Sequence, residues 1–447
     1  MKLLARFASA LVLSVFVAVP ARAQQVDWAK IGQEATATLE QYIRIDTTNP
    51  PSHTTKAADF LEAIFKREGI PVTRYESAPG KSIIVARLKG SGTGGKPILL
   101  LNHMDVVPAD AANWKHSPFS GQLIDGEIWG RGAMDMKGLG VIELYAMVAL
   151  KQAGVHLTRD VIFLSEPDEE TGGGDGARWM IAHHYQELDP EYVLDEGGFG
   201  SRDLYTPGKT VFGISVEEKR VVWIRVTAIG VAGHASQPTK TNPNDELVKA
   251  LAHLVSQPLP TGDVQVLKTM EGKLGTFSDN KFMNAIRHST ISLTTMASGV
   301  GNPPKVNVIP GDATATLDCR LLPGVDPKAW VELVKQRLGD PKLKVEVMYQ
   351  GDGSILTPVD SPMYKALDHA ITTVHPGAIV TPILVPYGTD SNTFREHGTK
   401  SYGLYPIIAP TVLVNTMHGD NERMPAAQLA PGARIVFEAV KEVAGGK

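Results

Sequence analysis

Short apolar runs rich in β-branched residues alternate with longer amphipathic segments in the first 200 residues of the chain. The runs have the length of buried strands and lie at residues 83–88, 97–101, 161–164 and 192–194, with one more at 411–414. The longer segments predict helices at residues 29–42, 56–68, 138–152 and 177–185. Buried strands that alternate with helices predict an α/β fold whose mostly parallel sheet is flanked by helices on both faces.

A different order of elements begins near residue 216. Strands are predicted at residues 217–228, 290–296, 313–320 and 344–349, and helices at 243–256 and 327–338. This β-α-β-β-α-β order is the split βαβ pattern of a ferredoxin-like α+β domain. We therefore predict a larger domain made of residues 24–215 and 351–447, with a smaller domain inserted at residues 216–350.

The N-terminus has the pattern of a secretory signal. Lys2 and Arg6 precede an apolar run at residues 11–19, and the small-residue stretch Pro20-Ala21-Arg22-Ala23 follows. The run is about half of the roughly 20 residues that cross a bilayer, which disfavours a membrane anchor. We expect cleavage of residues 1–23 and export to the periplasm or the medium, with no membrane span left in the mature protein.

Composition narrows the class of function. The chain has 447 residues, of which 43% are hydrophobic and 21% charged, as in ordinary globular proteins. Its formal net charge of −4 provides no basic field for a nucleic acid or an anionic membrane. The single cysteine excludes a disulfide framework. We therefore expect a small-molecule substrate.

Imidazole and carboxylate side chains recur just after the predicted strands of the larger domain. The residues that follow strands are His103, Asp105, Asp168, Glu169, Glu170, Asp195, Glu196 and His418, and Asp135 lies in a glycine-rich turn before a predicted helix. Each alone also fits a solvated loop or a helix cap. In α/β sheets, however, ligands bind beyond the carboxyl ends of the strands, where these residues would converge. Such a set of ligands suits zinc or a similar divalent ion.

Seven motifs in a fixed order carry a family resemblance. They are His103-Met104-Asp105, Gly130-Arg131-Gly132 running to Asp135, Asp168-Glu169-Glu170, Asp195-Glu196-Gly197-Gly198, Gly233-His234-Ala235-Ser236, Asn307-Val308-Ile309-Pro310 and the late His418. The chain resembles the co-catalytic zinc exopeptidases that include carboxypeptidase G, aminoacylase, succinyl-diaminopimelate desuccinylase and carboxypeptidase S. The form of the Asp195 motif is most similar to the branch of carboxypeptidase S and secreted N-acyl-amino-acid hydrolases.

The resemblance implies a zinc exopeptidase-like catalytic domain with two Zn²⁺ per subunit, Co²⁺ or Mn²⁺ being alternatives. It implies one metal held by His103, Asp135 and Glu196, and the other held by Asp135, Glu170 and His418, so that Asp135 bridges them. Such a pair polarises a scissile carbonyl and lowers the pKa of a water. Glu169 would be the general base, in an extended segment that points it away from Glu170, and Asp105 would orient His103.

The resemblance also implies residues that bind the substrate. His234 would stabilise the oxyanion, often in the active site of a partner subunit, and Asn307 and Arg320 would bind the substrate carboxylate. Gly388 and Thr389 resemble a further substrate loop. The inserted domain would serve as a lid and dimerisation domain, although a monomer stays open. Residues 257–287 are longer than in compact members of the family, and the sequence does not place them.

We therefore expect an exported dinuclear zinc hydrolase of the carboxypeptidase or aminoacylase type. It would cleave the amide bond of dipeptides or N-acyl amino acids that have a free C-terminal carboxylate. Two alternatives stay open. One is a deacylase of a single N-acyl metabolite, and the other is an inactive exported binding protein that keeps the fold.

Overall fold

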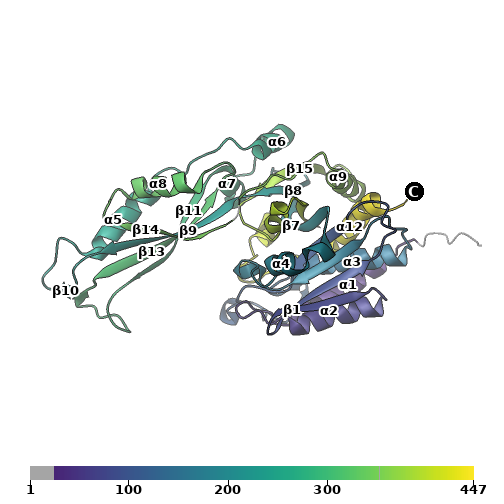
Figure 1. Ribbon diagram of the computed structural model, residues 1–447, viewed down its shortest axis with the longest axis horizontal. Helices are drawn as coiled ribbons and strands as arrows, with labels where there is room; N and C mark the ends of the chain where they lie inside the picture. The colour runs from purple at the N-terminus through teal and green to yellow at the C-terminus, as the bar shows by residue number, and fades with distance from the viewer. Residues whose placement is uncertain (1–24, 352, 447) are drawn as a thin grey trace, which may run out of the picture.

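The computed structural model describes residues 25–351 and 353–446, and the predicted signal at residues 1–23 lies outside them. The chain forms a large α/β lobe and an elongated smaller lobe that projects from it (Figure 1). Within the described residues, no helix combines the length and the apolar character needed to cross a membrane.

An eight-stranded sheet forms the centre of the large lobe. Its order is β1 (Val72–Ala78), β2 (Lys81–Leu88), β6 (Val161–Glu166), β3 (Ile98–His103), β7 (Tyr192–Ser201), β16 (Lys400–Ile408), β8 (Val211–Glu218) and β15 (Ile379–Val385). The four central strands β6, β3, β7 and β16 are parallel. Their carboxyl ends therefore meet at one edge of the sheet, where residues distant in sequence come together.

Helices cover both faces of this sheet, in agreement with the continuous burial of β3 and β6 along their whole length. Ile84 and Ala86 of β2 face one core, with α1 (Trp28–Ile43), α2 (Thr55–Arg67), α3 (Lys137–Gln152), α9 (Pro362–Val374) and α12 (Leu429–Ala444). Ile83 and Val85 face a second core with α4 (Ala177–Leu188) and α10 (Ser391–Glu396). The predicted α/β fold is confirmed, with a further small sheet of β17 (Arg423–Pro425), β5 (Glu127–Trp129) and β4 (Gln122–Ile124) beside it.

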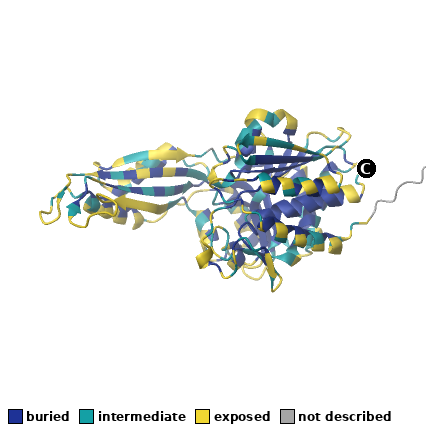
Figure 2. Cartoon of the chain, turned by 90° about the horizontal axis from the view of Figure 1, so that it is seen from below, coloured by how far each residue is buried: buried dark blue, intermediate teal, exposed yellow. Residues whose placement is uncertain are grey.

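The smaller lobe contains a four-stranded antiparallel sheet in the order β11 (Thr290–Ser298), β13 (Asp312–Leu321), β9 (Arg220–Ile229) and β14 (Lys344–Gln350). With α5 (Pro243–Val255) and α8 (Pro327–Leu338), the chain follows the expected β-α-β-β-α-β order. Both helices pack on one face of the sheet. The other face is open (Figure 2). Trp223 and Tyr349, whose rings lie 5.0 Å apart, are exposed on it.

The segment between α5 and β11 returns to the large lobe. It forms α6 (Gln265–Leu274), which packs against β15, and α7 (Lys281–Arg287). Met270, Met283 and Ile286 are buried in the core of the large lobe. Residues 257–287, which the sequence does not place, therefore interrupt the smaller lobe and complete the larger one.

The strand predicted at residues 411–414 is wrong. These residues form the short helix α11 (Thr411–Val414), and the strand before His418 is β16. An apolar run of four residues is too short for its periodicity to separate a strand from a helix. Pro410, which lacks an N–H for strand pairing, precedes the run and sets the start of the helix.

Replacing Gly403 in β16 with Ala should lower the free energy of unfolding by about 1–3 kcal/mol, since the added Cβ would lie 2.2 Å from the backbone oxygen of Glu196. Gly272→Ala in α6 is the control, because a Cβ there meets nothing within 4 Å. The control change should stabilise the protein by about 1 kcal/mol at most. Urea denaturation measures both, and equal stability of the two variants would contradict the close approach of β7 and β16.

Candidate metal centre

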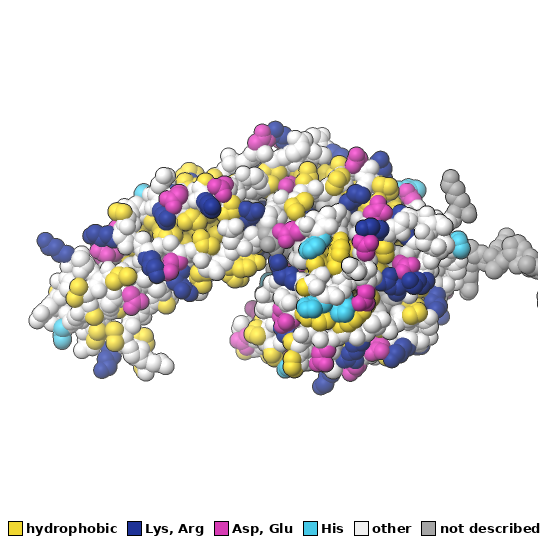
Figure 3. Space-filling model, in the orientation of Figure 1, with side chains coloured by type: hydrophobic (Ala, Val, Ile, Leu, Met, Phe, Trp, Pro, Cys, Tyr) yellow, Lys and Arg dark blue, Asp and Glu magenta, His cyan; other side chains and the backbone are white. Residues whose placement is uncertain are grey.

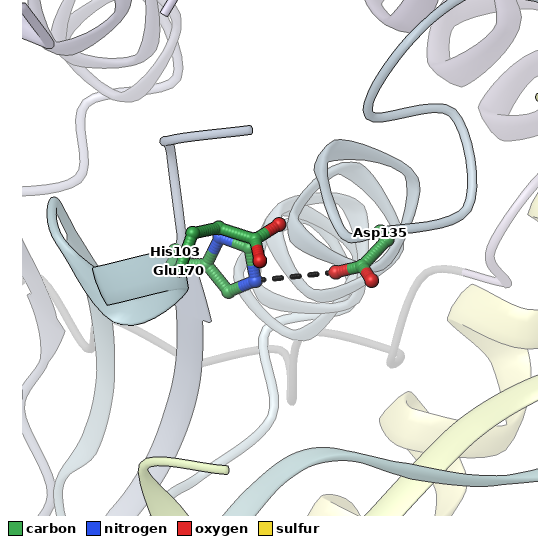
Figure 4. Close-up of side chains that lie close together, drawn as sticks. All are labelled: His103, Asp135 and Glu170. Atoms are coloured by element: carbon green, nitrogen blue, oxygen red, sulfur yellow. Dashed lines mark ion pairs between the residues drawn. The ribbon is translucent and has the colours of Figure 1, made fainter. Parts of the chain in front are cut away.

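The central parallel strands bring the predicted ligands together. His103 is the last residue of β3, and Glu169 and Glu170 lie in a turn directly after the neighbouring strand β6. The ligand atoms of His103, Asp135 and Glu170 all lie within 4.8 Å of one another, and so do those of His103, Glu169 and Glu196. Figure 4 shows His103 and Glu170 side by side, facing Asp135. We call these five residues together with His418 the metal cluster.

Asp135 lies between two imidazoles. Its Oδ1 is 3.4 Å from Nε2 of His103, and its Oδ2 is 3.1 Å from Nε2 of His418 (Figure 4 shows the first pair). Nε2 of His418 is also 3.1 Å from Oε2 of Glu170, whereas Oε1 of Glu196 is 3.9 Å from Nε2 of His103. Each oxygen of Asp135 thus faces one half of the cluster, which is the arrangement expected of a bridging carboxylate.

A bulge in β7 aims Glu196 at the cluster. Gly403 of β16 pairs with Asp195 and the next residue, Leu404, pairs with Gly198, so Glu196 and Gly197 have no partners on β16. Gly197 has a φ of 154°, and a Cβ there would lie 2.8 Å from Cβ of Ser215. Bulges re-aim side chains in this way, and glycine permits this one.

Two unpaired atoms show that the cluster fits a cation. Nε2 of His103 and Oε1 of Glu170 are buried and have no hydrogen-bond partner among the described residues. Nδ1 of His103 donates to the backbone oxygen of Asp105 at 2.9 Å, which leaves Nε2 as the nitrogen free to bind a metal. A buried polar atom without a partner is costly, and a divalent ion would satisfy both atoms.

The charges of the cluster also favour a bound cation. Burial and the nearby carboxylates raise the pKa of Glu169 and of Glu196 well above the usual range of a glutamate. Hydrogen bonds that His418 donates to Asp135 and Glu170 raise the pKa of His418 to about 11. Carboxylates crowded in this way need positive charge among them, and cations at this position would supply it.

Glu169 and Glu170 do not lie in an extended segment, contrary to the prediction. They begin a 3-10 turn (Glu169–Thr171) after Asp168, which has a left-handed φ of 81°. Oδ1 of Asp168 accepts from Lys81 Nζ at 2.5 Å and from the Thr171 hydroxyl at 2.8 Å, bonds that tie the turn down. Sequence reasoning missed this because three acidic residues in a row indicate no such turn.

Asp105 contacts His103 mainly through its backbone. Its Oδ1 is 3.4 Å from Nδ1 of His103, farther than the backbone oxygen that accepts from the same nitrogen at 2.9 Å. The other carboxylate oxygen accepts from Asn49 Nδ2 at 2.7 Å and from the backbone N–H of Glu170 at 3.3 Å. Asp105 therefore links β3 to the Glu169 turn, and Asn49, which the sequence does not single out, holds it in place.

Asp195 supports the next helix rather than the cluster. Its Oδ2 accepts from the backbone N–H of Ser391 at 2.9 Å and from the Ser391 hydroxyl at 2.8 Å, at the first residue of α10. A carboxylate at this place stabilises a helix N-terminus. Asp195 therefore holds the N-terminus of α10 beside the strand that carries Glu196.

Glu422 is a residue of the site that sequence reasoning missed. It is fully buried and accepts hydrogen bonds from the backbone N–H groups of Gly132 at 3.1 Å, Met134 at 2.7 Å and Asp135 at 3.0 Å. It also forms an ion pair of 2.8 Å with Arg131. One carboxylate thus holds the whole turn that presents Asp135. Its only sequence signal is its place four residues after His418.

Two cavities adjoin the metal cluster. The interlobe cavity has a volume of about 630 Å³ and is lined by Trp223 and Arg320 of the smaller lobe as well as by residues of the large lobe. Figure 3 shows a hollow between the two lobes. The α7 cavity, about 460 Å³, is lined by Asp135, Glu196 and His418 together with residues of α7. Glu169, Glu170 and Gly388 line both cavities. The cluster therefore lies where the two cavities meet.

The predicted substrate residues fall in two places. Gly388, Thr389 and Arg320 line the interlobe cavity, although Arg320 already donates to Asp318 through Nε at 2.7 Å and Nη2 at 3.0 Å. Thr389 is buried, with its N–H bonded to Glu218 at 2.8 Å. His234 lies instead in β10 (Gly233–His234), and Asn307 directly precedes β12 (Val308–Ile309), the strand with which β10 pairs at the far end of the smaller lobe (Figure 1). Both residues are exposed. Neither lines one of the two cavities.

Comparison with known proteins decides the family. Residues 99–442, well over half of the chain, match the model described as Peptidase family M20/M25/M40. The chain belongs to this peptidase family. Aminoacylase-1A of Rattus norvegicus is 29% identical to this M20 family member over 413 residues, covering 91% of this chain and 94% of the relative. The N-fatty-acyl-amino acid synthase/hydrolase PM20D1 of Mus musculus is 28% identical over 445 residues, covering 92% and 87%.

Solved structures agree on the fold. Human carnosine dipeptidase 1 has a TM-score of 0.71 at 19% identity, covering 94% of this chain and 99% of that one. The M20 family metallo-carboxypeptidase Sso-CP2 from Sulfolobus solfataricus has a TM-score of 0.69 at 21% identity, covering 92% and 99%. This M20 family chain is thus a hydrolase that acts on the amide bonds of peptides or N-acyl amino acids. The carboxypeptidase S branch stays a prediction.

In this M20 family hydrolase, Glu422→Gln should lower the free energy of unfolding by about 3–5 kcal/mol, because it leaves Arg131 buried without its partner. The loosened turn should also weaken metal binding through Asp135. Glu127→Gln is the control, since Glu127 pairs with Arg423 in a half-exposed position nearby and should contribute at most about 1 kcal/mol. Urea denaturation and zinc titration measure both effects, and an unchanged zinc affinity in Glu422→Gln would contradict the holding role.

Proposed function

We propose that this chain is an exported, dinuclear zinc hydrolase that cleaves the amide bond of N-acyl amino acids or dipeptides with a free C-terminal carboxylate. The observation that carries the proposal is the position of Asp135, whose two oxygens face His103 and His418 at 3.4 and 3.1 Å. Membership of the M20 family and the likeness to aminoacylase-1 support it. Export rests on the signal pattern at residues 1–23.

Two half-sites of the cluster would hold the metals. One consists of His103, Asp135 and Glu196, and the other of Asp135, Glu170 and His418. Imidazole and carboxylate donors suit Zn²⁺, with Co²⁺ or Mn²⁺ as alternatives. When bound, the ions would supply a Lewis acid for the scissile carbonyl and a water of lowered pKa.

Glu169 is the candidate general base. It lines both cavities, so it adjoins any amide bond that spans them. Its raised pKa, caused by burial and by Glu196 and Glu170, favours a carboxylate that takes up a proton readily. Glu169 would accept the proton of the attacking water and later donate it to the nitrogen of the leaving amino acid.

The interlobe cavity is the proposed place of the substrate carboxylate. Arg178, Lys219 and Arg320 line it, together with Gly388 and Thr389. Asp318 holds the Nε side of the Arg320 guanidinium, which fixes its direction while Nη1 stays available for a carboxylate. Lys219 donates to the backbone oxygens of Ala285 and His288 and to the Thr290 hydroxyl, and burial lowers its pKa to about 7, so Arg320 is the main candidate for the substrate carboxylate.

His234 and Asn307 would act on a second copy of the chain. Both lie at the far end of the smaller lobe, and the backbone N–H of Ala235 donates to the Asn307 oxygen at 3.0 Å, which keeps them together. A homodimer through this lobe would bring them to the partner's cluster as oxyanion and carboxylate donors. Support comes from β11, an edge strand on which Met296 is 53% exposed.

Replacing Glu169 with Gln should lower kcat by roughly 10² to 10⁴ while zinc stays bound, because the base is lost and the ligands are kept. Mass spectrometry of a mixed panel of N-acyl amino acids and dipeptides measures turnover by the zinc-loaded protein and the variant. Glu271→Gln, on the exposed side of α6, is the matched control. No turnover by the zinc-loaded parent protein would refute the proposed hydrolase, and near-normal turnover by Glu169→Gln would refute the base.

Replacing Asp135 with Asn should impair both half-sites, because each depends on one oxygen of this carboxylate. We expect the bound zinc, measured by inductively coupled plasma mass spectrometry after dialysis, to fall from two equivalents per chain to one or fewer. Asp110→Asn, at an exposed cap, should keep both equivalents. An Asp135→Asn variant that retains two equivalents would show that this residue does not bridge.

A further inference from the structure

The α7 cavity has an apolar wall beside the metal cluster. The side chains that form this wall are Phe199, Phe282, Ala285, Tyr387, Val414 and Met417. Phe282 and Ala285 are one helical turn apart on α7 and therefore face the same side of that helix. A pocket of about 460 Å³ with an apolar lining and a few convergent polar groups is typical of a small-molecule site.

The wall is a fixed part of the large lobe. Asn280 caps α7 through its bond to the Met283 N–H at 2.9 Å, and its Nδ2 donates to the Leu204 oxygen at 2.7 Å. At the other end, Lys219 Nζ donates to the Ala285 oxygen at 2.9 Å. Met283 is buried in the core beneath. Because both ends and the inner face are held, α7 presents a preformed surface rather than a mobile lid.

The two cavities differ in charge on either side of Glu169. Outside the metal cluster, the interlobe cavity is lined by Arg178, Lys219 and Arg320 and by two acidic side chains, Glu218 and Asp390, of which Glu218 forms an ion pair with Arg395. Lys281 is the only charged side chain outside the metal cluster among the described residues that line the α7 cavity, and it is exposed. A substrate that spans both would therefore place its carboxylate in the interlobe cavity and its apolar end against α7.

Resting on the proposed hydrolase function, we propose that the α7 cavity binds the apolar acyl chain of an N-acyl amino acid. A dipeptide would bring an ammonium group into this cavity. The described residues offer that group no carboxylate beyond those of the metal cluster, and Lys281 would repel it. An acyl chain carries no such charge, and each methylene that it buries favours the complex by about fourfold in kcat/KM.

A series of N-acyl leucines from acetyl to decanoyl tests the size of the pocket. We expect kcat/KM of the zinc-loaded protein to rise with chain length by about fourfold for each buried methylene until the cavity is full. If acetyl-leucine is cleaved but kcat/KM does not rise with length, the acyl pocket is refuted while the hydrolase stands. If no member of the series or dipeptide is cleaved with zinc bound, the proposed function itself fails.

Filling the cavity tests its location. Ala285→Phe should lower kcat/KM for decanoyl-leucine by about tenfold or more and leave acetyl-leucine within about threefold, since the new ring occupies the space of the chain. Asn284→Phe introduces the same ring on the exposed side of α7 and should change neither. Equal loss for both substrates in Ala285→Phe, with normal thermal stability and zinc content, would overturn the assignment.

A matched pair of substrates tests the choice of class. Leucyl-leucine and 4-methylpentanoyl-leucine have the same carbon skeleton and differ only in the amino group. We expect the acyl compound to have the higher kcat/KM by about tenfold or more, because it carries no ammonium to desolvate. A preference for leucyl-leucine would overturn the proposal and assign the cavity to the amino-terminal residue of a dipeptide.

Discussion

The structure depends on the crowding of four carboxylates at one point. Asp135, Glu169, Glu170 and Glu196 approach one another around His103 in a largely buried space, where burial and mutual repulsion disfavour their charges. Two imidazoles, those of His103 and His418, are the only basic side chains that pair with Asp135 among the described residues. The surrounding hydrogen bonds act against this repulsion. Glu422 holds the Asp135 turn and Asn49 holds Asp105, so the ligands stay in place at a free-energy cost that a bound metal would offset.

Parallel strands make this crowding achievable. Three neighbouring strands, β6, β3 and β7, deliver Glu169, His103 and Glu196 to the same edge, although these residues are far apart in sequence. The turn before α3 and the loop after α11 then close the cluster from outside the sheet. A rigid core on both faces fixes the strand ends, and the cavities lie on either side of the resulting cluster. The strand ends therefore fix one side of the cluster, and the turn before α3 and the loop after α11 supply Asp135 and His418 on the other.

Those parts of the molecule that depend on local sequence patterns could be predicted from the sequence. The α/β order, the ferredoxin-like order and the residues of the cluster all follow from short runs and motifs. Features that rest on long-range contacts were missed. Glu422 meets Asp135 across 287 residues of sequence, and Phe282 faces the cluster only because α7 leaves the smaller lobe. The wrong strand at residues 411–414 and the 3-10 turn at Glu169 are local failures, since runs of three or four residues carry no resolvable period.

The return of residues 257–287 to the large lobe means that the smaller lobe is not a module in the evolutionary sense. Deletion of residues 216–350 as one segment would remove Met270, Met283 and Ile286 from the core of the larger lobe. The chain instead passes between the lobes four times, and the two inner passages are joined where the Ser289 N–H donates to the Pro260 oxygen at 2.9 Å. Recombination that exchanges this lobe between relatives would have to replace two separate segments and keep the one between them. The smaller lobe and the wall of the α7 cavity are therefore encoded in one continuous stretch of sequence, although they belong to different lobes of the fold.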